Sequence, residues 1–135
     1  MIHDEICTYE VCKLAKEKGF PQHITDEAYI VDNYGEDDYN IGDRLPIPLV
    51  PDYMDDIAAP TQSLLQRWLR EEKGLCISVE AYPTLAINGK ICFAWVIKSG
   101  SDGHFMESND SLQTFSTYEL ALEDALKYAL ENLAV

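Results

Sequence analysis

The sequence predicts an α+β fold in which helices pack on one face of an antiparallel sheet of three or more strands. Three observations support this class. Two early segments have apolar residues at helical spacing and end in glycine, which indicates helices. Asn88-Gly89 separates two apolar runs, which indicates a hairpin. The C-terminal segment is amphipathic, which indicates a further helix. The 135 residues predict one domain, 1–135, with an α-β-β-β-α core over residues 60–135.

The first helix is predicted over residues 8–19. Thr8 is a suitable N-cap, Gly19 ends the helix, and Phe20 can make the apolar contact of a Schellman motif. One face of this helix is expected to be buried because it carries Cys7, Val11, Leu14 and Ala15.

Residues 21–59 form an acidic segment without helical periodicity, which predicts irregular structure. Ala28–Val31 and Leu45–Val50 are candidate short strands. The second belongs on an edge or in a loop, because its prolines lack amide donors. Arg44 is the one basic residue among the acidic side chains Asp26, Glu27, Asp32, Glu36, Asp37, Asp38, Asp43, Asp52, Asp55 and Asp56.

A second helix is predicted to start with Pro60 in its first turn and to end at Gly74. Its apolar side holds Leu64, Leu65, Trp68 and Leu69. We expect Trp68 to share a core with the last helix, so that Trp68→Ala costs about 3 to 5 kcal/mol. The alternating residues from Ile77 to Ala81 predict a half-buried strand that Pro83 stops.

The Asn88-Gly89 pair predicts a tight hairpin turn. The following strand, Ile91 to Ile97, is apolar on both faces, with Phe93 and Trp95 on one of them, and is therefore expected at the centre of its sheet. Two further short strands are predicted at His104–Glu107 and Leu112–Phe115.

The last helix is predicted from a capping box of Ser116 and Glu119 and a hydrophobic staple of Phe115 and Leu120. Its periodicity predicts a buried face of Tyr118, Leu122, Ala125, Leu126, Ala129 and Leu133.

The order of elements from residue 60 onward resembles the double-stranded-RNA-binding domain and the related small domain of HicB-type antitoxins. The RNA-binding domain has lysines where its last helix begins, but this chain has the acidic run Thr117–Asp124, so RNA binding is not carried over. Residues 14–20, 59–71 and 117–122 also resemble short uncharacterised proteins encoded by gut-bacterial phages and prophages. This second resemblance implies a mobile-element context and no site residues.

No catalytic, cofactor-binding or metal-binding residues are predicted. The three histidines, His3, His23 and His104, have no neighbouring nucleophile motif; His104, after the glycine-containing turn 99–103, is the first to inspect. Four cysteines are expected as reduced thiols, because Cys76 and Cys92 fall in apolar strands and Cys7-x4-Cys12 lacks zinc-site spacing. The run 38–49 lacks the final glutamate of a calcium loop.

A formal net charge of -14 disfavours nucleic acid and anionic membranes as direct partners. The N-terminus has no signal-peptide pattern, so a cytoplasmic location is expected. The leading hypothesis is a non-enzymatic phage or prophage accessory protein that binds another, basic, protein. Its candidate interaction surface is Tyr34, Asp37, Asp38, Tyr39, Tyr53, Asp55 and Asp56.

Other interpretations remain open at this stage. The tyrosines of the acidic segment could instead pack on the domain's own core, and the acidity could serve solubility alone. The chain could also be an acidic nucleic-acid mimic that inhibits a DNA-binding protein, or a small enzyme with a pocket lined by His104 and carboxylates.

Overall fold

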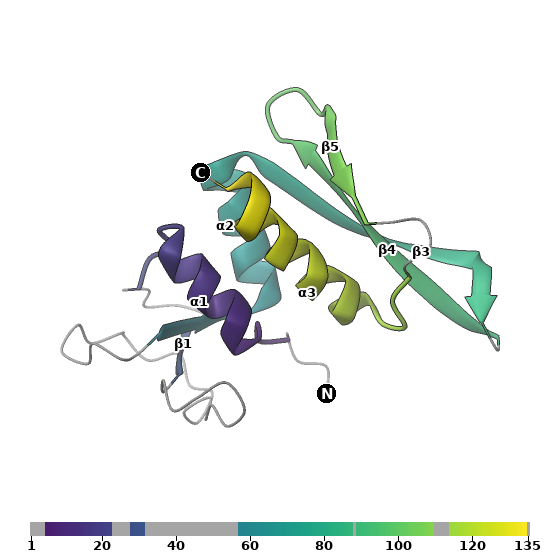
Figure 1. Ribbon diagram of the computed structural model, residues 1–135, viewed down its shortest axis with the longest axis horizontal. Coiled ribbons are helices and arrows are strands. Elements are labelled where there is room, and N and C mark those ends of the chain that lie inside the picture. The colour runs from purple at the N-terminus through teal and green to yellow at the C-terminus, as the bar shows by residue number, and fades with distance from the viewer. Residues whose placement is uncertain (1–4, 23–27, 32–56, 88, 110–113, 135) are drawn as a thin grey trace. The chain divides into compact units, whose positions relative to one another are not determined.

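The computed structural model describes residues 5–22, 28–31, 57–87, 89–109 and 114–134, and these have an α+β fold, as predicted (Figure 1). The chain divides into two compact units, Met1–Leu65 and Gln66–Val135, with the boundary inside the second helix. Each unit is described separately. The single domain over residues 1–135 stays a prediction.

Helix α1 (Tyr9–Glu17) of the first unit begins and ends as predicted. The Thr8 side chain accepts a hydrogen bond from the Val11 amide, at 3.4 Å. At the other end Gly19 has φ 97°, its amide donates to the Lys16 carbonyl, and the Phe20 amide donates to Ala15, at 2.9 Å. These two bonds form a Schellman motif.

The first unit also contains a two-stranded antiparallel sheet of β1 (Ala28–Val31) and β2 (Ile57–Pro60). The candidate strand Ala28–Val31 is confirmed as β1. Strand β2 was not predicted, so the prediction of irregular structure is wrong at Ile57–Ala59. The candidate strand Leu45–Val50 lies outside the described residues.

The placement of Pro60 in the first helical turn is wrong, because Pro60 is the last residue of β2 and its carbonyl accepts from the Cys7 amide, at 3.0 Å. Helix α2 (Gln62–Lys73) begins after Thr61, whose hydroxyl oxygen accepts from the Leu64 amide, at 3.2 Å. Thr61 therefore supplies the cap that the sequence analysis did not identify.

The apolar side of α2 is buried to different depths. Leu65 and Leu69 are fully buried, whereas Leu64 and Trp68 are half-buried. The Lys73 ammonium group lies 5.5 Å from the centre of the Trp68 ring. The helix ends at Gly74, with φ 67°, as predicted.

The sheet of the second unit is antiparallel and has the order β3 (Leu75–Ile87), β4 (Lys90–Ser99), β5 (Phe105–Ser108). The predicted hairpin is confirmed, since Ile87 pairs with Lys90 and Gly89 has φ 76°. The central position of β4 is confirmed as well. The α-β-β-β-α order is therefore that of α2, β3, β4, β5 and the last helix.

Two strand predictions need correction. Pro83 does not stop β3, which is an edge strand and can accommodate a residue without an amide donor; its register shifts between Tyr82 and Ile87. Of the predicted strand Leu112–Phe115, the described part is a single bridge between Phe115 and Phe93, while residues 112 and 113 lie outside the described residues.

Helix α3 (Tyr118–Tyr128) continues into a π-helical turn, η1 (Ala129–Leu133), and packs against β3 and β4 (Figure 1). The predicted capping box and staple are wrong: Thr117 is the N-cap, accepting from the Leu120 amide at 3.1 Å, and Leu120 is 53% exposed. Tyr118, predicted to be buried, is 42% exposed, and Leu133 is half-buried. The buried face consists of Ala121, Leu122, Ala125, Leu126, Ala129 and Leu130.

Candidate functional site

In the sequence, the residues of the predicted interaction surface fall between strands β1 and β2. All seven of its residues, Tyr34, Asp37, Asp38, Tyr39, Tyr53, Asp55 and Asp56, fall outside the described residues. The structure describes the base from which their segment leaves. Val31 and Ile57 are direct partners in the β1–β2 ladder, so the chain departs and returns at adjacent positions.

Side-chain hydrogen bonds and burial fix this base. The Gln22 side chain accepts from the Ala58 amide and donates to the Phe20 carbonyl, with both distances 2.9 Å. The residues Ile57, Ala58 and Ala59 are buried. The Gln22 side chain thus connects β2 to the end of α1, and Ile57, the residue that follows segment 32–56, belongs to a packed and hydrogen-bonded element.

The charge of the chain is concentrated in this region. Residues 26–56 contain 10 of the 24 acidic side chains and only Arg44 of the 10 basic ones. The same region holds Tyr29, Tyr34, Tyr39 and Tyr53, half of the 8 tyrosines. Most of the net charge of -14 therefore comes from residues 26–56.

A second candidate, in the second unit, is a cluster of two aromatic rings and two carboxylates. The Trp95 indole nitrogen donates to Asp124 Oδ2, at 2.8 Å, and the Tyr128 hydroxyl donates to Glu107 Oε2, at 2.9 Å. The two rings pack with centroids 5.3 Å apart and planes tilted by 40°. The hydrogen bond to Glu107, followed by burial and the carboxylate charge, raises the pKa of Tyr128 above its usual 10.0.

This cluster is best explained as a structural contact. Trp95 is 2% exposed, so its ring offers little surface to a ligand. Both carboxylates already accept hydrogen bonds from the ring partners, which attach α3 to β4 and β5. This cluster was not predicted from the sequence. Its signal was the polar pair Asp124 and Tyr128, one helical turn apart beside the apolar face of the last helix.

His104 lies on the surface next to Asp102. Its side chain is 83% exposed, and Nε2 is 3.9 Å from Asp102 Oδ2. The Asp102 side chain also accepts from the His104 backbone amide, at 3.0 Å, which is typical of a local turn. His3 and His23 lie outside the described residues.

Two searches of the described residues gave no candidate. Within residues 5–22, 28–31, 57–87, 89–109 and 114–134, no group of three His, Cys, Asp or Glu side chains could hold a metal ion. In the same ranges, no helix has the length and apolar character that a membrane crossing requires.

Comparisons with known proteins give no relative for this chain: no family model, no curated protein and no solved structure matches it.

Proposed function

We propose that this protein binds another protein, one with a basic surface, through the acidic and tyrosine-containing segment 32–56. The observation that carries the proposal is the concentration of charge between two strands that pair directly at Val31 and Ile57. The strongly acidic segment is therefore connected at both sides to a folded pair of strands, β1 and β2. By its resemblance at residues 59–71 and 117–122, we place this role among the accessory proteins of a phage or prophage in the cytoplasm.

Two physical effects support this function. An excess of negative charge attracts a basic partner over a distance of about a Debye length and speeds association. Tyrosine side chains provide contact area at a low cost in side-chain entropy.

The test compares two variants that remove the same charge. The first replaces Asp37, Asp38, Asp55 and Asp56 by Asn. The control replaces four exposed glutamates of the described residues by Gln: Glu5, Glu17, Glu72 and Glu131. A partner is captured with the parent protein from a bacterial lysate and purified, and association rates are measured at several salt concentrations.

The Asp variant should associate more slowly and with a weaker salt dependence. At about 0.15 M salt, where repulsion between charges is largely screened, both variants should be about as stable as the parent. The control should associate nearly as fast as the parent. If the Asp variant associates as fast and with the same salt dependence as the parent, the proposal fails.

The same concentration of charge supports a second candidate function, mimicry of a nucleic acid. Carboxylates spaced like phosphates would occupy the basic groove of a DNA-binding protein. If the protein is such a mimic, the captured partner should bind duplex DNA. The parent protein should displace that DNA from the partner, and the Asp variant should not. A partner without affinity for DNA leaves the first function as the explanation.

A further inference from the structure

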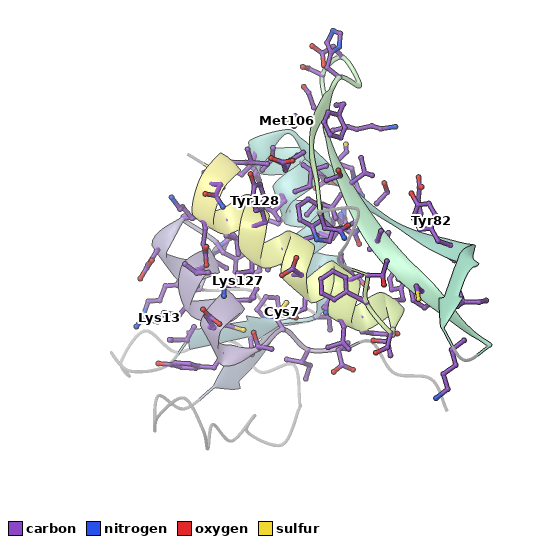
Figure 2. All side chains as sticks on the ribbon, turned by 45° about the vertical axis from the view of Figure 1, so that its right-hand side comes forward. Cys7, Lys13, Tyr82, Met106, Lys127 and Tyr128 are labelled. Atoms are coloured by element: carbon purple, nitrogen blue, oxygen red, sulfur yellow. The ribbon has the colours of Figure 1, made fainter. Side chains whose placement is uncertain are left out.

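Two cysteines lie on either side of the N-cap of α1. Cys7 directly precedes Thr8, and Cys12 is the fourth residue of the helix. These are the positions whose side chains meet in a hydrophobic staple. Both side chains are 0% exposed, and the Cys12 thiol donates to the Cys7 carbonyl with a sulfur–oxygen distance of 3.6 Å. Figure 2 labels Cys7, just before α1.

The two cysteines of the second unit are too far apart to pair with each other. Cys92 on β4 lies opposite Tyr82 on β3, six residues along that strand from Cys76. Six residues of a strand span about 20 Å, whereas a disulfide requires Cα atoms within about 7 Å. All four cysteines are present as thiols. Of the two pairs within a unit, distance excludes Cys76 with Cys92, which leaves Cys7 and Cys12 as the candidate pair.

We propose that Cys7 and Cys12 form a dithiol that a low-molecular-weight disulfide, such as glutathione disulfide, converts reversibly into an intrachain disulfide. One cysteine thiolate attacks the oxidant, breaking its sulfur–sulfur bond and releasing one thiolate. The second cysteine then attacks the mixed disulfide and releases the other thiolate. The protein loses two electrons to the oxidant, and the two cysteine protons end on the released thiols.

The position of Cys7 connects this reaction to the base of the acidic segment. Its backbone amide donates to the Pro60 carbonyl at the end of β2, at 3.0 Å, and α1 packs on β2. The bridge moves Cys12 Sγ from the Cys7 carbonyl to the Cys7 sulfur and pulls residue 7 toward the helix. The disulfide does not depend on the proposed function. Its role in regulating partner binding does rest on that function.

Burial determines how fast the bridge forms. Because both thiols are inaccessible, the oxidant reacts only when the first turn of α1 opens. The bond between the Val11 amide and the Thr8 hydroxyl helps to close that turn. Removing an N-cap costs about 1 kcal/mol, so Thr8→Ala should oxidise about fivefold faster than the parent.

The experiment equilibrates the full chain with mixtures of oxidised and reduced glutathione. Intact mass should show the loss of two hydrogens, alkylation should modify only Cys76 and Cys92, and proteolysis should give a fragment that links Cys7 to Cys12. Cys7→Ser and Cys12→Ser should instead carry a glutathione adduct. A Cys76→Ser, Cys92→Ser double variant, the matched control, should form the bridge as the parent does.

Three results would overturn the proposal: four alkylated cysteines in the parent at the most oxidising mixture, a bridge to Cys76 or Cys92, or an oxidation rate that Thr8→Ala does not raise. The first two results are measured on the parent protein, so the proposal can be tested even if a serine variant does not fold. Partner affinity is measured separately for oxidised and reduced protein. Equal affinities would reject the regulatory role and leave the disulfide and the proposed function standing.

Discussion

Trp95 makes more specific contacts than its place in an apolar run suggests. Its indole nitrogen donates to Asp124 on α3, its ring packs on Tyr128, and its backbone amide donates to Asn109 after β5, at 2.7 Å. The burial of Trp95 in a central strand followed from the sequence pattern. Its polar partners did not, because they depend on where the last helix lies along the strand.

Replacing Trp95 by Ala should therefore destabilise the protein by about 3 to 5 kcal/mol, since it empties a large buried site and leaves Asp124 without its donor. Trp68→Ala is the matched control. Trp68 is only half-buried, so we now expect a loss of about 1 to 2 kcal/mol in place of the value suggested by the sequence. Urea unfolding measures both, and equal losses would mean that Trp68 is a core residue.

At the scale of elements, local signals were predicted well and distant pairings were not. The Schellman motif after α1 and the hairpin at Gly89 involve residues close in sequence, and both are confirmed. Strand β2 was not predicted, because its partner β1 lies about thirty residues earlier in the chain and no local sequence pattern indicates that the two pair. The continuation of β3 past Pro83 likewise depends on its edge position in the sheet.

The start of α3 was predicted one residue too early, and the reason lies outside the helix. Ser116 and Thr117 are both good caps. Phe115, however, exchanges two backbone hydrogen bonds with Phe93 on β4, at 2.8 and 2.9 Å. The chain is therefore still paired with the sheet at residue 115, and Thr117 is the residue that caps.

Thr117→Ala should then cost about 0.5 to 2 kcal/mol, because the Leu120 amide loses its acceptor. Ser116→Ala, a change of the same kind one residue earlier, should have almost no effect. Thermal unfolding of both variants decides between the two caps. A larger loss for Ser116→Ala would support the cap that the sequence first suggested.

At the scale of the whole molecule, the sequence specified the charge of the candidate site but not its geometry. The α+β class and the order α-β-β-β-α followed from periodicity and turn residues. The acidic segment 21–59 was recognised by composition, and the structure adds that Val31 and Ile57, on either side of positions 32–56, pair directly. Composition could not predict that pairing, since a charged segment has no periodicity that would reveal it.

The net charge of -14 has a consequence for stability as well as for binding. Self-repulsion destabilises a compact state, and added salt screens it. Salt would weaken two ion pairs of the described residues, Arg67–Glu71 and Lys127–Glu131. All four side chains are at least 40% exposed, so these pairs contribute little. Screening should therefore stabilise the protein on balance.

We expect the midpoint of thermal unfolding to rise as NaCl increases from about 0.01 M to about 0.15 M, where the Debye length falls from about 30 Å to about 8 Å. The variant with Asn at 37, 38, 55 and 56 should show a smaller rise. The control with Gln at 5, 17, 72 and 131 loses the same charge but keeps the dense region 26–56, so its rise should lie between the other two. A midpoint that falls with salt in the parent, or equal rises in the two variants, would show that repulsion is not centred on the acidic segment.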